Sequence, residues 1–210
     1  MSHQDTGRTA PYRIFVAISL PEDVRHAITA AQAELRGALP PECVRWTKPG
    51  QFHLTLKFLG GVEVHRLEAL SGSVRGACEG LGRLPLRAGQ IRFFPTPRHP
   101  RVVWVRVQDR FDRLSDLQRA VETATADFTS ERPEGTYTGH ITLGRCQRIK
   151  RPQAESLAKL AAAMENRLLG EWTAETVDII RSELSSSGSR YTTLATCPLG
   201  GQPIECQREG

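Results

Sequence analysis

The sequence is poor in cysteine and contains no long hydrophobic run. Its 210 residues include five cysteines, an odd number, and no two of them form a C-x-x-C pair. This spacing argues against a disulfide framework and against a zinc site. No apolar run approaches the roughly 18 residues that a membrane-spanning helix needs, and Met1–Ala10 lacks the hydrophobic core of a signal peptide. We therefore expect a cytoplasmic protein without a membrane segment.

Lysine is scarce as well, although the chain is basic. Only 4 of the 28 basic residues are lysine and 24 are arginine; the formal net charge is +5 and the pI about 9.2. The guanidinium group matches the geometry of phosphate. A positive charge therefore favours an anionic partner such as a phosphate ester or a nucleic acid. A coding bias toward arginine would give the same composition, so the charge alone does not decide the partner.

Hydrophobic periodicity predicts alternating strands and helices between two polar tails, 1–11 and 201–210, with a single domain over 12–200. The expected strands are Tyr12–Ser19, Phe52–Leu59, Leu84–Ile91, Arg101–Val107, Tyr137–Leu143 and a closing hairpin of Thr176–Ser182 with Tyr191–Ala195. The expected helices are one that begins at Pro21 and is ended by Gly37, and three over about Val64–Cys78, Phe111–Phe128 and Arg151–Leu169. The proline-rich segment Phe94–Arg101 is expected to be a stiff basic loop.

The order of these elements contains a duplication. A strand, a helix, a loop and a His-x-Thr strand occur from Ile14 to His53 and again from Val102 to His140, with separations of 39 and 38 residues (53 − 14 and 140 − 102). A long period that occurs twice indicates two pseudo-symmetric lobes. We expect an α+β fold in which each lobe has an antiparallel sheet with helices outside, and in which the lobes face each other across a central cleft.

The first His-x-Thr motif, His53-Leu-Thr55, lies in a predicted strand. Alternate side chains of a strand point to opposite faces. Phe52, Leu54, Leu56 and Phe58 should therefore share the core face, and the other face should carry His53, Thr55 and Lys57. The imidazole and the hydroxyl would lie about 7 Å apart along the strand, a gap that one phosphate can bridge.

The second motif, His140-Ile-Thr142, repeats this pattern. Gly139 and Gly144 flank the motif, and we expect them to leave room for a ligand near the backbone. Arg145 follows directly, where it can reach an anion or meet solvent. The alternative reading of both motifs is a pair of half-buried histidines that are hydrogen-bonded to backbone.

Two histidines suit the hydrolysis of a cyclic phosphodiester. The reaction needs one group to deprotonate water and another to protonate the leaving oxygen. Imidazole, with an unperturbed pKa of about 6.5, can do either near neutral pH. Threonine hydroxyls can donate hydrogen bonds to the non-bridging oxygens as charge develops.

These motifs resemble those of the two-histidine (2H) phosphoesterases, and within them the bacterial RNA 2′,3′-cyclic phosphodiesterases, which are also named 2′-5′ RNA ligases. The resemblance runs from Tyr12 to Leu199. The matching segments are Arg13–Ile18, Arg45–Trp46, His53–Gly60, Phe94–Arg101, His140–Arg145 and the stretch Ser186…Gly188…Tyr191.

The resemblance implies a bilobal α+β fold with both motifs on the floor of a cleft. It implies that the cyclic ester opens to leave a 2′-phosphate without a metal or other cofactor. His53 would donate a proton to the leaving 3′-oxygen and His140 would accept one from water. Thr55, Thr142 and Arg145 would bind the phosphate. The expected substrates are RNA with 2′,3′-cyclic phosphate ends or cyclic nucleotides, with no obligate protein partner.

Other candidates are weaker. Lys57 reads as an exposed lysine at a strand end, and Trp46 can stack on a base or belong to the core. Arg98 and Arg101 in the proline-rich segment can guide an RNA strand. The remaining histidines have no paired partner in the sequence and are read as ordinary; they are His3, His26, His65 and His99.

Three alternatives to hydrolysis by two histidines stay open. The same histidines can join a 2′,3′-cyclic phosphate to a 5′-hydroxyl, which forms a 2′-5′ linkage by the reverse reaction. A non-catalytic RNA- or nucleotide-binding module is the second, although binding alone would tolerate Arg or Asn in place of histidine. A metal-dependent esterase is the third, and it is disfavoured because no carboxylate shares either motif strand.

Overall fold

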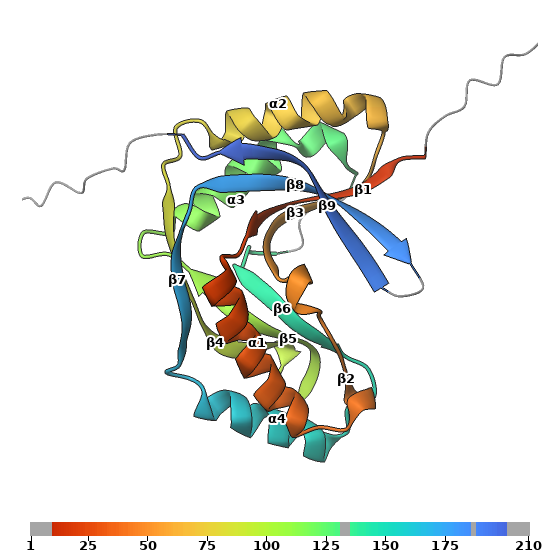
Figure 1. The fold of residues 1–210 in the computed structure, drawn as a ribbon, viewed down its shortest axis with the longest axis vertical. Helices are drawn as coiled ribbons and strands as arrows, with labels where there is room; N and C mark the ends of the chain where they lie inside the picture. The colour runs from red at the N-terminus through yellow and green to blue at the C-terminus, as the bar shows by residue number, and fades with distance from the viewer. Residues whose placement is uncertain (1–9, 131–134, 186–187, 201–210) are drawn as a thin grey trace, which may run out of the picture.

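Two antiparallel sheets organise the chain, and α-helices lie on their outer sides (Figure 1). The computed structural model describes residues 10–130, 135–185 and 188–200. The four-stranded sheet has the order β3-β1-β8-β9 and the five-stranded sheet the order β2-β6-β5-β4-β7. The strands are β1 (Tyr12–Ser19), β2 (Val44–Trp46), β3 (His53–Val62), β4 (Leu84–Thr96), β5 (His99–Gln108), β6 (His140–Cys146), β7 (Leu168–Ala174), β8 (Thr176–Ser185) and β9 (Gly188–Pro198). The helices are α1 (Glu22–Gly37), α2 (Leu67–Cys78), α3 (Arg113–Ala124) and α4 (Arg151–Ala163). The predicted α+β fold is confirmed.

The predicted duplication is visible in the strand pairing. β1 pairs with β3 as β5 pairs with β6. Val16 lies opposite Lys57, and Val103 lies opposite Gly144, an offset of 87 residues on both strands (103 − 16 and 144 − 57). The separations of 39 and 38 differed because the structural counterpart of Ile14 is residue 101 (14 + 87) rather than residue 102.

The first helix of each repeat packs against the sheet of the other repeat. α1 lies with α4 on the five-stranded sheet, where a Cβ on Gly170 of β7 would be 2.6 Å from Val24 of α1. α3 lies with α2 on the four-stranded sheet, and Figure 1 shows the two helix pairs at opposite ends of the molecule. Because of this exchange, each repeat buries the apolar surface of the other.

Both His-x-Thr strands contain a β-bulge at the leucine that follows the threonine. In β3, Thr55 lies opposite Ala17 and Lys57 opposite Val16, so Leu56 is an extra residue. In β6, the register shifts in the same way around Leu143. A bulge reverses the facing of the residues beyond it.

The bulge overturns two expectations of strict alternation. Lys57, expected on the face of His53, is buried at 6 % exposure, and Phe58, expected in the core, is 55 % exposed. Thr55 precedes the bulge and keeps its predicted face with His53. The alternation therefore held up to the bulge and failed beyond it.

A side-chain interaction supports each bulge from a neighbouring helix. Lys57 Nζ lies 2.8 Å from Glu122 Oε1 of α3 and donates to the Glu122 carbonyl at 3.0 Å. On the other side, the buried Gln32 of α1 donates through Nε2 to the carbonyls of Leu143 and Thr47, both at 2.8 Å. These contacts satisfy groups that would otherwise be buried without a partner.

The proline-rich segment is not the predicted loop. β4 continues to Thr96, β5 begins at His99, and the two strands form a hairpin with a register shift at Phe94/Pro95. The prolines are tolerated because β7 pairs with β4 only from Leu84 to Gly89. Beyond that point no described strand pairs with the outer edge of β4, so the N–H that a proline lacks there is not needed for a ladder.

The predicted helix over 151–169 is too long, and the sequence reading missed β7. α4 ends at Ala163, and Leu168–Ala174 pairs with the first half of β4. The alanine- and leucine-rich pattern continues past the helix end, so periodicity alone does not mark the change. The expected strand over 137–143 begins only at His140, and the short β2 was also missed.

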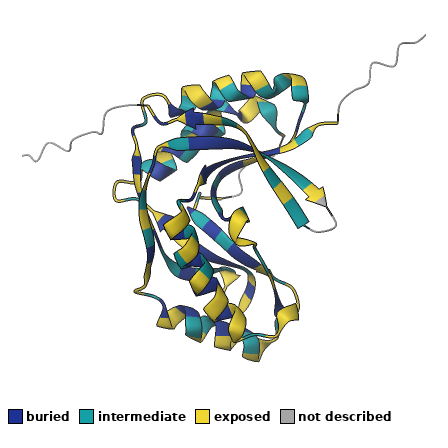
Figure 2. Cartoon of the chain, in the orientation of Figure 1, coloured by how far each residue is buried: buried dark blue, intermediate teal, exposed yellow. Residues whose placement is uncertain are grey.

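The buried residues form one main cluster that reaches both sheets (Figure 2). It includes Ile28 of α1, Leu54 of β3, Leu117 of α3 and Ile141 of β6. In the described part of the chain, no helix combines the length and the apolar character that crossing a membrane demands. The predicted tails over 1–11 and 201–210 lie outside the described residues, except for residues 10 and 11.

The buried Lys57–Glu122 pair yields a test of the first bulge. Lys57→Ala should lower the free energy of unfolding by about 2 kcal/mol, because it leaves a partly buried carboxylate without its partner. Chemical denaturation measures the loss. The control is Lys159→Ala on the exposed surface of α4, which should change stability by less than about 0.5 kcal/mol. Equal effects of the two substitutions would contradict this role for Lys57.

Candidate active site

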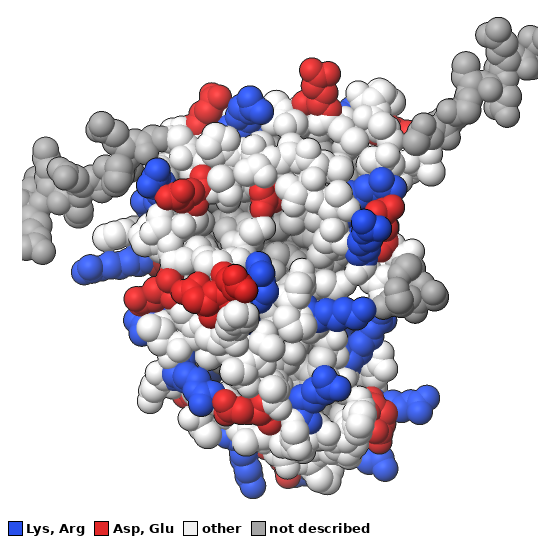
Figure 3. Space-filling view, viewed as in Figure 1, with Lys and Arg blue, Asp and Glu red and all other residues white. Residues whose placement is uncertain are grey.

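A cleft of about 540 Å³ separates the two sheets, and both His-x-Thr motifs open into it. The four-stranded sheet contributes residues of β1, β3, β8 and β9, and the five-stranded sheet contributes residues of β2 and β6. The face drawn in Figure 3 carries both signs of charge, with basic side chains along its right-hand edge, on the side of β2 and the β8–β9 hairpin. The predicted central cleft is therefore present, with basic surface near one end.

His53 lies at the start of β3 and is held on three sides. Its Nδ1 is 2.7 Å from the carbonyl oxygen of Gln51. The Gln51 side chain in turn donates to the carbonyl of Ser189 in β9. The imidazole packs against the rings of Phe15 and Tyr191, with centroid distances of 4.7 and 5.4 Å. Backbone and aromatic contacts therefore fix the orientation of the ring.

His140 lies in the equivalent place at the start of β6. Its Nδ1 is 2.8 Å from the carbonyl oxygen of Thr138, again two residues earlier. Phe94 and Trp104 pack edge-on against the imidazole at 5.4 and 5.7 Å and stack on each other at 4.4 Å. The two histidines are thus oriented by the same kind of hydrogen bond and by different aromatic pairs.

The hydrogen bonds at Nδ1 decide which nitrogen can do chemistry. A carbonyl oxygen accepts only, so Nδ1 of each histidine must carry the proton. Nε2 is then the atom that can gain or lose a proton, as in other histidines whose tautomer is set by a backbone partner. The alternative reading, half-buried histidines bound to backbone, describes the contacts correctly, but both side chains also line the cleft.

Burial lowers the pKa of both histidines below the usual 6.5. For His53 the main cause is loss of hydration, and the positive charge of His140 adds to it, while the bond to Gln51 opposes the shift. For His140 the main cause is again burial, and the nearby Arg145 adds to it, while the bond to Thr138 opposes it. Each histidine is therefore more readily neutral than a free imidazole.

The other predicted site residues gather at the same cleft. Thr55, Thr142 and Arg145 all line it. Tyr137 donates from its hydroxyl to the carbonyl of Thr55 at 3.0 Å, which links the approach to β6 with β3. Its burial raises the pKa of Tyr137 far above the usual value. The structure thus brings both halves of the predicted constellation together.

Several cleft residues were missed or left undecided by the sequence. Phe58 reaches the cleft because of the bulge at Leu56, a feature that strand alternation does not reveal. Arg13, Arg45 and Tyr191 also line the cleft. In β1 the residues after Arg13 are buried from Ile14 to Ile18, so no polar–apolar alternation marks the face that lines the cleft. Trp46 lines the cleft and also packs against the core; its stacking on a base stays a prediction.

The flanking glycines have a different role from the expected one. A Cβ on Gly139 would lie 2.6 Å from the carbonyl of Val107, and one on Gly144 would lie 2.7 Å from Val44 Cγ1 and 3.0 Å from Trp46. The space beside them is therefore filled by protein rather than left for a ligand. Gly144 lets β2 approach β6 and so helps to place Trp46 at the cleft.

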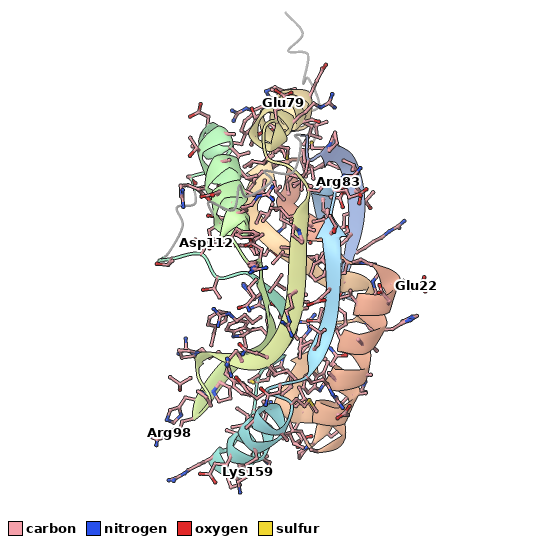
Figure 4. The ribbon with its side chains drawn as sticks, turned by 90° about the vertical axis from the view of Figure 1, so that its left-hand side faces the viewer. Glu22, Glu79, Arg83, Arg98, Asp112 and Lys159 are labelled. Carbon is pink, nitrogen blue, oxygen red and sulfur yellow. The ribbon has the colours of Figure 1, made fainter. Side chains whose placement is uncertain are left out.

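The sequence suggested that two arginines of the β4–β5 hairpin can guide an RNA strand, but both lie outside this cleft. Arg98 lies at the hairpin tip and points away from the body of the molecule in Figure 4, and neither it nor Arg101 lines the cleft. Within the described ranges, no group of three or more His, Cys, Asp or Glu side chains is placed to hold a metal ion.

Comparison with known proteins gives a consistent answer. A family model described as "LigT like Phosphoesterase" matches residues 18–104. An RNA 2′,3′-cyclic phosphodiesterase of Methanothermobacter thermautotrophicus is 32% identical over 183 residues, which cover 87% of this chain and 96% of that protein. The chain belongs to the LigT-like phosphoesterases.

Solved structures share the fold. The crystal structure of TT0787 of Thermus thermophilus matches with a TM-score of 0.71 and 26% identity, and covers 91% of this chain and 100% of that one. The structure of E. coli LigT complexed with NADP+ matches with a TM-score of 0.69 and 26% identity, over 90% and 98% of the two chains. The expected bilobal 2H phosphoesterase fold is therefore confirmed.

The close contact at Gly144 can be tested. Gly144→Ala should destabilise the protein by about 1–3 kcal/mol, because the added methyl group overlaps Val44 and Trp46. Thermal unfolding measures the loss. The matched control is Gly76→Ala in α2, where nothing lies within 4 Å of the new Cβ and the better helix propensity should stabilise by about 0.5–1 kcal/mol. A Gly144→Ala variant with unchanged stability but weaker substrate binding would instead support the ligand-space reading.

Proposed function

We propose that this LigT-like phosphoesterase hydrolyses 2′,3′-cyclic phosphodiesters at RNA ends or in nucleotides, with His53 and His140 as its acid–base pair. The observation that carries the proposal is the pairing of two histidines across one cleft, each of which donates its Nδ1–H to a backbone carbonyl. Both Nε2 atoms are thereby left to exchange protons with a substrate. The curated name of the Methanothermobacter relative supports the substrate class, and the NADP+ bound to E. coli LigT supports a nucleotide-sized ligand.

The unequal surroundings of the two histidines support unequal roles. Arg145 lowers the pKa of His140, which favours the neutral imidazole that a general base needs. The cationic neighbour that lowers the pKa of His53 is His140, which carries no charge when it acts as the base, and a bound phosphate anion would raise the pKa of His53. We therefore assign proton donation to the leaving 3′-oxygen to His53 and proton abstraction from water to His140, which leaves a 2′-phosphate.

The threonines and Arg145 complete the proposed site. Thr55 and Thr142 each share a strand face with a histidine, so their hydroxyls can donate to the two non-bridging oxygens of one phosphate. The Arg145 guanidinium can neutralise the charge that builds on these oxygens in the transition state. We also propose that residues 12–200 act as one domain, because one buried cluster joins both sheets.

Replacement of either histidine should abolish most of the activity. His53→Ala and His140→Ala should each lower kcat on a 2′,3′-cyclic nucleotide by about 10²–10⁴-fold, the usual contribution of a general acid or base. The measurement is steady-state turnover with identification of the product, which should be the 2′-phosphate. His65→Ala, at an exposed position outside the cleft, is the matched control and should keep full activity.

Other outcomes of this experiment point elsewhere. Full turnover in either cleft variant would refute the two-histidine mechanism. A 3′-phosphate product would show that the 2′-oxygen is the leaving group. Loss of wild-type activity with a chelator would indicate a metal-dependent reaction. Absence of turnover by the wild-type protein on every cyclic phosphate would favour a binding module.

The pKa shifts predict an acidic pH profile. The active free enzyme needs His140 neutral and His53 protonated, and the pKa of both lies below 6.5. The profile of kcat/KM, which reports the free enzyme, should therefore have its optimum on the acid side of 6.5. The alkaline limb of kcat should lie at higher pH, because the bound phosphate stabilises protonated His53.

Arg145→Gln provides the internal check of that profile. Removal of the positive charge beside His140 should raise the pKa of this base, so the acid limb of kcat/KM should move to higher pH. The variant should also raise KM, because a phosphate contact is lost. An unchanged acid limb would show that Arg145 does not influence the base.

A cytoplasmic location stays a prediction. The four cysteines within the described residues are free thiols, which is in accord with a reducing compartment.

A further inference from the structure

The five-stranded sheet has one face that no helix covers in the described part of the chain. Seen from the side in Figure 4, α1 lies along one face of this sheet, and side chains project freely from the other face between Asp112 and Arg98. β6 presents His140 on this open face, within the catalytic cleft. The open face is therefore continuous with the active site.

Arg106 lies beside His140 on this face. The two residues are direct partners in the β5–β6 ladder, so their side chains share a face with Cβ atoms about 4.5–5.5 Å apart. Arg106 is exposed and makes no hydrogen bond or ion pair with the residues that the structure describes. Its charge is thus available to an anion next to the catalytic histidine.

Arg106 also lines a second hollow, of about 230 Å³, on the side away from Thr142. Gly89, its partner on β4, has no side chain, and the Arg167 carbonyl would lie 3.2 Å from a Cβ placed there, so the Arg167 backbone borders the hollow. A register shift between Gly89 and Ile91 and a left-handed backbone at Gln90 (φ 59°) accompany the hollow. Bulges of this kind redirect side chains at functional surfaces.

The hollow is rich in charged and polar groups. Three arginines line it, Arg87, Arg106 and Arg167, with one acid, Glu165. Arg87 lies 3.6 Å from Glu171 in an exposed ion pair and Arg167 lies 2.6 Å from Glu34, so among the described residues Arg106 is the lining arginine without an acidic partner. Glu165 is already held by Arg92 through two hydrogen bonds of 2.6 Å. The other polar lining residues are Gln90, Gln108 and Asn166. Such a mixture suits the sugar–phosphate backbone of a single strand, which offers phosphate oxygens to arginine and 2′-hydroxyls to amides.

We propose that this open face, from Arg106 to the hollow around Arg87, binds the RNA strand on the 5′ side of the cyclic phosphate. The inference rests on the proposed function, because only that function places the terminal phosphate at His140. It adds a substrate preference: the enzyme acts better on oligoribonucleotides than on cyclic mononucleotides. The cyclic phosphate engages the two histidines, and the preceding phosphates engage Arg106 and then Arg87.

The test compares two substrates on one enzyme. The substrates are a 2′,3′-cyclic mononucleotide and an oligoribonucleotide of about ten residues with the same 3′-terminal cyclic phosphate. Wild-type kcat/KM should be at least about tenfold higher on the oligoribonucleotide. Arg87→Gln combined with Arg106→Gln should lower the oligoribonucleotide value about tenfold, mostly through KM, and should leave the ratio between the two substrates near one.

Salt dependence gives a second readout that a structural defect would not reproduce. Each lost phosphate contact should reduce the slope of log KM against log salt for the oligoribonucleotide by about 0.7. The matched control is Arg119→Gln on α3, an exposed arginine whose ion pair among the described residues is with Asp116 on its own helix. It should change neither the substrate ratio nor the salt slope. Circular dichroism checks that all variants are folded.

Three results would overturn the proposal. One is a wild-type enzyme that does not distinguish the two substrates. Another is a double variant with full activity on the oligoribonucleotide. The last is an equal loss on both substrates, which would show that Arg106 acts on His140 rather than on RNA. Failure of the proposed function looks different, because the wild-type enzyme would then turn over neither substrate.

Discussion

The β-bulge in each His-x-Thr strand is the constraint on which the site depends. A regular strand would place the residue two positions after the threonine on the same face as the histidine. The extra leucine, Leu56 in β3 and Leu143 in β6, reverses that facing. As a result Phe58 and Arg145 reach the cleft, while Lys57 and Gly144 turn inward. One local irregularity, used twice, thus defines which side chains a substrate meets.

Each bulge is contacted by a helix of the other repeat. A bulge leaves backbone groups without ladder partners. Gln32 of α1 bonds the Leu143 carbonyl at one bulge, and Lys57 beside the other bulge is bound by α3. Each supporting helix comes from the repeat that does not own the strand. The repeats therefore cannot separate without loss of the site.

The pseudo-symmetry of the fold does not extend to the side chains beside the two histidines. Residue 57 is a lysine and its counterpart 144 is a glycine, while residue 58 is a phenylalanine and its counterpart 145 is an arginine. A positive charge therefore lies beside His140, and an aromatic ring lies on the His53 side of the cleft. This difference separates the pKa environments of two histidines that otherwise have the same kind of backbone partner, a carbonyl two residues earlier. A pseudo-symmetric scaffold thereby places two equivalent histidines in unequal surroundings.

The sequence by itself determined the fold class, the duplication and the residues at its centre. His53, Thr55, His140 and Thr142 were predictable because they precede the bulges, where side-chain alternation is strictly local. The structure decided what depends on distant partners: the inward turn of Lys57, β7, the hairpin in place of a proline loop, and the protein-filled space beside the glycines. These depend on which strand or helix lies next to a residue. That is set by packing between segments far apart in the chain and is not encoded in any short stretch of sequence.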